Sequence, residues 1–129
     1  MPEIDQEAYD IADAVAGKCI VTRARMRARA LTRLYDAALA PIGLRSTEYA
    51  VLIATGRFRS GRMHKIAAAL SMDLSTLSRS MAKLGAKGLV TIHTEGHRTR
   101  LVTLTDKGHA VLRAGYPHWQ KAQTEASAL

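Results

Sequence analysis

The chain has 129 residues, 47% of them hydrophobic and 23% charged, and a formal net charge of +8 at pH 7. This length favours one domain with a modest core, and the ordinary apolar content, without any run long enough to span a bilayer, excludes a disordered tail or a membrane protein. A single Cys excludes an intrachain disulfide framework and fits a reducing cytoplasm, and the acidic N-terminus is unlike a signal or transit peptide.

Two helices are predicted before residue 45. The acidic segment at residues 1–17 carries apolar residues at helical spacing and ends at Gly17. A long basic helix follows over residues 18–40, and the sequence PIG at 41–43 stops it because proline cannot continue a helix. The apolar positions of these two helices are Ile4, Ala8, Ile11 and Val15, followed by Ile20, Ala24, Ala28, Leu31, Tyr35 and Leu39.

Three short helices are predicted next. Ser46 is the expected N-cap of a helix over residues 46–55, and a polar connection with two glycines leads to an Ala-rich helix at 63–70. The third helix covers residues 74–87, with Asp73 as its N-cap and Gly88 at its C-terminal exit. Its apolar side consists of Leu74, Leu77, Met81 and Leu84, and its polar side of Ser75, Thr76, Ser78, Arg79 and Lys83.

Two β-strands are predicted after this helix, because residues 89–94 and 99–105 alternate and are rich in Val, Ile and Thr. Residues 95–98 form the turn between them. Thr105 then caps a final helix that kinks or breaks at Pro117. The apolar residues of this helix are Val111, Leu112, Trp119 and Ala122.

Two short helices with a tight connection, followed by a β-hairpin, predict a winged helix-turn-helix in a mostly α (α+β) protein. Residues 46–104 form this DNA-binding unit, residues 1–45 supply N-terminal dimerisation helices, and residues 105–129 supply a C-terminal dimerisation helix, all in one integrated domain. The flanking helices carry apolar stripes that so small a unit cannot cover, so packing against a second copy is expected.

The polar side of residues 74–87 is unusual for a solvent-facing helix, because it carries small hydroxyls and two cations and no carboxylate after Asp73. Small hydroxyls allow a helix to lie close to DNA in the major groove, which is about 12 Å wide. Arg79 can bond guanine through its guanidinium, and Lys83 can reach the phosphate backbone. A Ser-rich surface helix is the alternative, but it leaves the basic wing behind the helix unexplained.

The charge distribution also favours a nucleic-acid partner. Residues 1–17 contain five carboxylates and no Lys or Arg, whereas the rest of the chain contains all 19 cations and six carboxylates. A body this basic attracts polyanions, although solubility alone also explains such a charge. The arginines of RARMRARALTR flank the apolar stripe of their helix, which favours chains that cover a dimer core over a single basic face.

The sequence resembles the MarR family of transcriptional regulators from about Lys18 to Gln123. The segment TRLYDAALAPIGLRSTEYAVL resembles the first two helices of the family, IAAALSMDLSTLSRSMAKLGAKGLV its helix-turn-helix, and RTRLVTLTDKGHAVL its second wing strand and the start of its last helix. The resemblance implies a cytoplasmic homodimer that binds a pseudopalindromic operator in double-stranded DNA, usually represses transcription, and releases the DNA when an effector arrives.

The expected DNA-binding residues are Ser75, Thr76, Ser78, Arg79, Lys83, His97, Arg98 and Arg100. By the resemblance, the two serines, the threonine and Arg79 lie where the recognition helix of the family meets DNA, and Arg98 matches the wing-tip arginine that enters the minor groove. The chain departs from the family at Leu74, where a cation is common, and at Gly96, where an Asp is common.

The sequence offers two further candidate sites, one for an effector and one for oxidation. Met26 and Tyr49 are expected to line a crevice between the dimerisation and DNA-binding parts that takes a small aromatic or other effector. Cys19 begins the long helix and is either a small buried hydrophobe or an oxidant sensor. The structural role is favoured because no second Cys can resolve a sulfenic acid.

His93 and His97 are four residues apart, but they lie on a hairpin with no Cys nearby, so no metal site is predicted.

Other function classes remain open. A chromatin-like protein that binds DNA without sequence preference is the first alternative, and a winged helix used as a protein-interaction module is the second. An enzyme is not predicted, because the sequence has no Gly-rich phosphate loop, no GxSxG and no paired catalytic carboxylates, and no cofactor is expected.

Overall fold

The computed structural model describes residues 3–96 and 99–129, and the chain divides into two compact units, Met1–Arg33 and Leu34–Leu129. The first unit contains helix α1 (Gln6–Val15) and most of the long helix α2 (Ile20–Leu39). Asp5 caps α1, since its carboxylate accepts a hydrogen bond from the Ala8 N–H at 3.0 Å. None of the residues of α1 is buried, so its apolar stripe faces solvent in the single chain.

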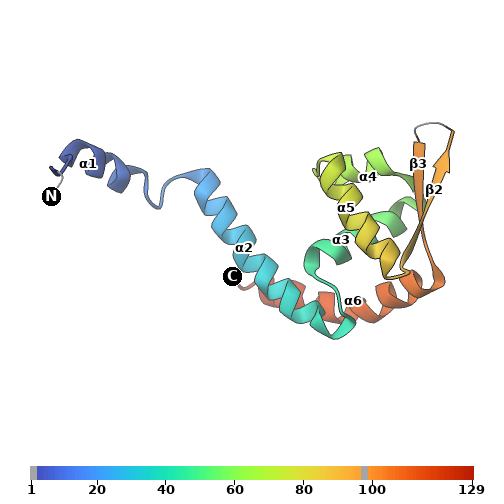
Figure 1. The fold of residues 1–129 in the computed structure, drawn as a ribbon. Helices are drawn as coiled ribbons and strands as arrows, with labels where there is room; N and C mark the ends of the chain where they lie inside the picture. Colours follow the sequence, from blue (N-terminus) through green and yellow to red (C-terminus); the bar gives the residue numbers. More distant parts are fainter. Residues whose placement is uncertain (1–2, 97–98) are drawn as a thin grey trace. The chain divides into compact units, whose positions relative to one another are not determined.

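The second unit contains the end of α2 and the rest of the chain. Its helices are the 3₁₀ helix η1 (Ala40–Ile42), α3 (Ser46–Phe58), α4 (Met63–Ala69), α5 (Leu74–Ala86) and α6 (Asp106–Ala126). Its strands are β1 (Ser60–Arg62), β2 (Val90–Glu95) and β3 (Thr99–Leu104), and they form an antiparallel sheet in the order β1-β3-β2. Figure 1 shows the long hairpin of β2 and β3, in which Ile92 is paired with Val102. This order of elements is a winged helix-turn-helix, which confirms the predicted fold class.

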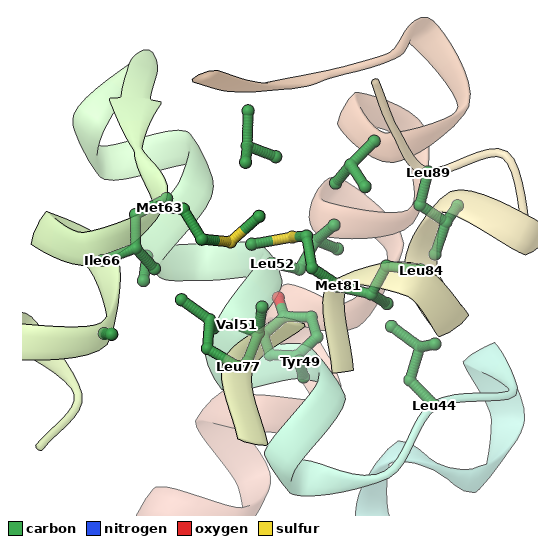
Figure 2. Close-up of a cluster of buried hydrophobic side chains, with 14 of the residues drawn as sticks. Leu44, Tyr49, Val51, Leu52, Met63, Ile66, Leu77, Met81, Leu84 and Leu89 are labelled. Atoms are coloured by element: carbon green, nitrogen blue, oxygen red, sulfur yellow. The ribbon is translucent and has the colours of Figure 1, made fainter. Parts of the chain in front are cut away.

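The core of the second unit lies where α3, α4 and α5 meet the sheet. Figure 2 shows Leu52, Met63 and Met81 directed toward one another from three helices. All three side chains are buried, as is Val102 on the central strand. The core therefore holds α5 by its apolar side and leaves the polar side of that helix outward. The other buried hydrophobic residues are Leu39, Leu44, Tyr49, Val51, Ala54, Ile66, Ala67, Leu77, Leu84, Leu89 and Val90, together with Ala122.

Two local predictions were wrong. Ser46 is the first residue of α3 and not its cap, because the preceding residue, Arg45, is in the extended N-cap conformation and Asp36 accepts the Ser46 N–H at 2.7 Å. Residues 55–62 are not a polar loop: α3 continues to Phe58, and Ser60–Arg62 pair with β3, a strand too short to show alternation in sequence. Of the two outcomes predicted at Pro117, a kink or a break, the break is excluded, since α6 runs through Pro117 to Ala126.

Candidate nucleic-acid interface

Helix α5 is anchored on one side and capped at its start. Leu77, Met81 and Leu84 are fully buried, so the helix cannot rotate without exposing its apolar side. Asp73 is the N-cap residue, as predicted, and its Oδ1 accepts the Thr76 N–H at 2.8 Å. Gly88, with φ of 76°, lies just beyond the C-cap, where an L-residue with a side chain is disfavoured. The sequence therefore fixes both ends of the helix.

The polar side of α5 is linked by side-chain hydrogen bonds. Ser75 Oγ donates to Asp73 Oδ1 at 2.7 Å, and Thr76 Oγ1 donates to Asp73 Oδ2 at 3.0 Å. Arg79 donates to Thr76 Oγ1 at 3.3 Å. Hydrogen bonds from the Thr76 N–H, and then from the Ser75 and Thr76 hydroxyls, lower the pKa of Asp73 to about 2. Asp73 is thus an anion at neutral pH that orders the first turn of the helix.

The wing contacts α5 through Arg100. This residue lies on β3, half-buried, and its guanidinium donates to Ser78 Oγ at 2.9 Å. The pairing of β3 with β2 places Arg100 opposite Thr94 on the hairpin. Two residues of the predicted DNA-binding set, which are 22 positions apart, are therefore in direct contact. The other two wing residues of that set, His97 and Arg98, lie outside the described residues.

Two more positions complete this surface. Lys83 is exposed near the C-terminal end of α5, in agreement with its predicted place on the polar side. Leu74 was counted with the apolar side, but 45% of it is exposed because the first turn of α5 extends beyond the core. Leu74 precedes Ser78 by four residues and so lies on the same side of the helix as that serine. The regular apolar spacing gave no sign of this exposure, although a cation, which is common at this position in the family that the sequence resembles, is typical of an exposed position.

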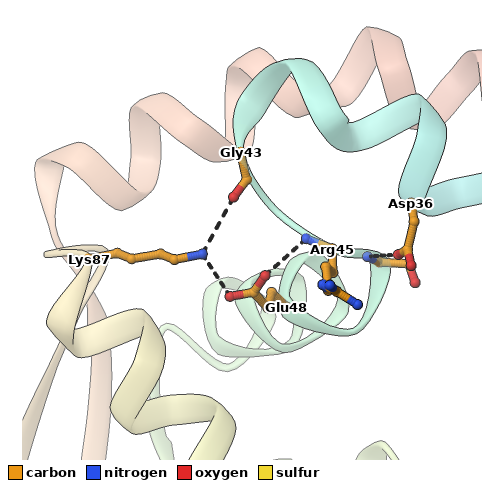
Figure 3. Close-up of polar contacts among 6 residues, drawn as sticks. Asp36, Gly43, Arg45, Glu48 and Lys87 are labelled. Carbon is orange, nitrogen blue, oxygen red and sulfur yellow. Dashed lines mark hydrogen bonds and ion pairs between the residues drawn. The ribbon is translucent and has the colours of Figure 1, made fainter.

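The C-terminal end of α5 is fastened to the start of α3. Lys87 Nζ lies 2.9 Å from Glu48 Oε2 and donates to the Gly43 carbonyl at 3.4 Å, as Figure 3 shows. Glu48 Oε1 accepts the Arg45 N–H at 3.0 Å. Partial burial alone would raise the pKa of Glu48, but the hydrogen bonds from Lys87 and Arg45 outweigh it and hold the pKa below its usual value. This network sets the position of α5 relative to α3.

Tyr49 occupies the junction of α3 and α6. Its side chain is buried, its hydroxyl donates to the Leu112 carbonyl at 2.9 Å, and burial raises its pKa. It lines an apolar hollow of about 450 Å³ together with Ile53, Leu112, Arg113, Tyr116 and Trp119. The rings of Tyr116 and Trp119 stack there at a centroid distance of 5.9 Å. The second predicted effector residue, Met26, belongs to the first unit, where it is 61% exposed.

A neighbouring hollow has a different character. It has a volume of about 700 Å³ and shares Ile53 and Leu112 with the first hollow. Its other lining residues are Gly56, Arg57, Arg59, Thr103, Leu104 and His109. The lining therefore contains two arginines and a histidine but no Asp or Glu. The two hollows together combine an aromatic surface with a cationic one along α3 and α6.

The remaining candidates are simpler. Cys19 is partly exposed, and hydrogen bonds with the Thr22 side chain and backbone lower the pKa of its thiol. In residues 3–96 and 99–129, no three His, Cys, Asp or Glu side chains are close enough together to hold a metal ion. Over the same ranges, none of the helices is both long enough and apolar enough to cross a membrane.

Known structures share this architecture. The Mycobacterium tuberculosis transcriptional regulator MosR, in a complex with DNA, is 31% identical over 86% of this chain and 82% of its own, with a TM-score of 0.80. Wild-type MarR from Escherichia coli, in its apo form, is 23% identical over 84% and 83% of the two chains, with a TM-score of 0.72. BpsR from Bordetella bronchiseptica, whose DNA binding is regulated by 6-hydroxynicotinic acid, is 18% identical over 86% and 81%, with a TM-score of 0.79.

Sequence comparison alone is less sensitive for this chain. No protein-family model matches it, and no curated protein sequence is significantly similar to it. The identity to MosR extends over most of both chains. With the order of elements and the capped, cation-bearing α5, this likeness identifies the chain: it belongs to the MarR family of winged-helix transcriptional regulators.

Proposed function

We propose that this protein represses transcription by binding a pseudopalindromic operator as a homodimer in the cytoplasm, and that an effector releases it. The observation that carries the proposal is the surface of α5, where hydroxyl groups and Arg79 face outward while Leu77 and Met81 are buried. A second copy would place two such helices about 34 Å apart, which is the spacing of successive major-groove faces.

In this proposal, α5 enters the major groove and the wing follows the neighbouring minor groove. Ser75, Ser78 and Arg79 face base edges, and Lys83 contacts phosphate, where a flexible ammonium acts as a point charge. Exposed Leu74 adds an apolar contact that suits the methyl group of thymine. Arg98 is the proposed minor-groove residue, with His97 beside it. The basic body supplies the attraction that does not depend on sequence.

The homodimer is supported by apolar residues that the single chain leaves in water. Ile11 and Val15 on α1 are more than half exposed, and Ile20 at the start of α2 is 82% exposed. Tyr116 on α6 is 54% exposed. A soluble protein rarely leaves so many large apolar residues uncovered on its terminal helices, so a second copy is the proposed cover.

The effector is proposed to bind in the two hollows along α3 and α6. The stacked rings of Tyr116 and Trp119 suit an aromatic body, and Arg57, Arg59 and His109 suit an acidic group. Tyr49 belongs to the wall of this site. An oxidant is a second effector class, favoured by the lowered pKa of Cys19. No enzymatic step is proposed for any of these residues.

The proposal is tested by the affinity of the protein for duplexes selected from a randomised library and for scrambled versions of them, across a salt series. A repressor prefers the selected inverted repeat by at least about 10³-fold at physiological salt. Equal, strongly salt-dependent binding to both duplexes would instead favour the chromatin-like alternative. Weak binding to both, without a steep salt dependence, would favour the protein-interaction module.

A further inference from the structure

The serines of a recognition helix do not by themselves select a base, because a hydroxyl group can both donate and accept hydrogen bonds. In this protein, the hydroxyl groups of α5 have partners that can act in only one way. Asp73 is an ionised carboxylate and can only accept, whereas Arg79 and Arg100 are guanidinium groups and can only donate. The direction of each hydrogen bond is therefore fixed by the chemistry of the partner.

Ser75 can offer only lone pairs to DNA. Its Oγ lies 2.7 Å from Asp73 Oδ1, and since the carboxylate cannot donate, the Ser75 hydroxyl proton is committed to that bond. The residue is exposed at the start of α5, so its lone pairs face outward. In the major groove, the groups that donate to a lone pair are the amino groups of adenine and cytosine.

Ser78 differs from Ser75 because its hydroxyl proton is not committed to a partner among the described residues. The Arg100 guanidinium donates to its Oγ at 2.9 Å and occupies one of the two lone pairs, which polarises the O–H bond and favours donation by Ser78 over a second acceptance. Within the part of the chain that the structure describes, the Ser78 hydroxyl donates to no other group, so its proton is available. Base atoms that accept a proton in the major groove are guanine O6 and N7, adenine N7 and thymine O4.

The Thr76 hydroxyl both donates and accepts hydrogen bonds within the protein. It donates to Asp73 Oδ2 at 3.0 Å and accepts from Arg79 at 3.3 Å, which leaves it no proton for DNA. Its role is to hold the Arg79 guanidinium beside the two serines. The surface of α5 therefore presents an acceptor at Ser75 and donors at Ser78 and Arg79.

We propose that Asp73 and Arg100 determine base preference as positioning residues, without touching a base: Asp73 makes Ser75 an acceptor, and Arg100 favours Ser78 as a donor. The proposal rests on the proposed function of α5 as the recognition helix. It predicts adenine or cytosine at the base that faces Ser75, and a base with a major-groove acceptor opposite Ser78.

Two substitutions remove these constraints while keeping the helix. In Asp73→Gly, glycine still suits the N-cap position, but the acceptor that faces Ser75 is lost and the Ser75 proton is free. In Arg100→Met, the donor to Ser78 is lost while a chain of similar length remains. The probe is the inverted repeat selected from a randomised duplex library, with all four base pairs tested at each position of one half-site.

The expected changes are confined to single positions. Asp73→Gly relaxes the preference for adenine or cytosine at the position that Ser75→Ala also affects, by about two- to tenfold, the discrimination of one hydrogen bond. Arg100→Met relaxes the preference by a similar factor at the position that Ser78→Ala affects. In a Ser78→Ala background, Arg100→Met causes no further change at that position, whereas Arg100→Lys in the parent chain retains the preference.

Controls separate positioning from charge and from folding. Lys83→Met removes one cation from the same helix and should weaken all duplexes equally, and thermal unfolding of each variant confirms that it is folded. If Arg100→Met weakens all duplexes equally and Asp73→Gly leaves the preference unchanged, the inference is wrong although α5 still reads DNA. The inference is also wrong if Ser78→Ala weakens every duplex equally. If the parent shows no preference and Ser75→Ala, Ser78→Ala and Arg79→Ala change nothing, the proposed function is wrong and the inference fails with it.

Discussion

Lys87 and Glu48 join the end of the recognition helix to the start of α3, with 2.9 Å between Nζ and Oε2. The same ammonium donates to the Gly43 carbonyl, so one side chain connects α5 to the segment that links α2 with α3. The carboxylate is the more buried partner, with 13% of its side chain exposed against 43% for Lys87. Any movement of α3 relative to the flanking helices therefore acts directly on the C-terminal end of α5.

The first prediction concerns this ion pair. Glu48→Gln keeps an oxygen for the Arg45 N–H but removes the charge that faces Lys87, so the free energy of unfolding should fall by about 0.5–1 kcal/mol. Glu125→Gln is the matched control, because Glu125 is exposed on α6 and forms no ion pair with the residues that the structure describes. Urea unfolding at low and high salt measures the change in the free energy of unfolding for both variants. Equal effects of the two substitutions would show that the pair contributes nothing.

The second prediction concerns acid. The pKa of Asp73 is lowered from 3.8 to about 2, so its contribution to stability is fully present above about pH 4 and is lost as the pH falls through about 2. Asp73→Asn keeps the cap and removes the titrating group, so the melting temperature should fall less between pH 4 and pH 2 than in the parent. Identical acid profiles for the two proteins would contradict this role of Asp73.

The third prediction compares two glycines. A Cβ at Gly108 would overlap the Leu89 carbonyl oxygen, a backbone atom that cannot move away, so Gly108→Ala should lower the free energy of unfolding by about 1–3 kcal/mol or more. At Gly85, inside α5, a Cβ would meet nothing within 4 Å. Gly85→Ala should therefore raise the free energy of unfolding by about 0.5–1 kcal/mol. Chemical denaturation tests both, and a stabilised Gly108→Ala protein would contradict the close approach of α6 to Leu89.

The sequence predicted those parts of the fold that depend on neighbouring residues. The cap at Asp73 and the stripe of Leu77, Met81 and Leu84 were predicted correctly because each depends on spacing within one helix. The strand at Ser60–Arg62 was missed because it is short and is defined by its pairing with β3, about 40 residues later in the chain.

The same limit applies to the candidate interface. Ser78 and Arg100 were both predicted to contact DNA, but no local pattern indicates that they contact each other, since 22 positions separate them. The outward position of Leu74 was not predicted either, because its spacing matched the buried stripe and only the extent of the core decides its exposure.

The fourth prediction concerns assembly. Sedimentation at micromolar concentration should show a species of twice the 14.0 kDa chain mass, because a second copy covers the apolar stripes of the terminal helices. Ile20→Glu places a charge on the exposed stripe and should shift the protein toward the monomer. Thr22→Glu, two residues later and about 200° around α2 at an exposed position, is the control and should leave the dimer intact. A clean monomer for the parent chain would contradict the proposal.

The central claim is that α5 reads DNA, and Arg79 tests it most directly. The measurement is the binding of Arg79→Ala and Lys83→Ala to the selected inverted repeat and to a scrambled duplex across a salt series. If Arg79 bonds guanine bidentately, its loss should cost about 1–3 kcal/mol on the selected site and relax the preference at one position per half-site. Lys83→Ala should weaken both duplexes about equally and reduce the salt slope. Binding of Arg79→Ala to both duplexes with the affinity of the parent would contradict the assignment of α5 as the recognition helix.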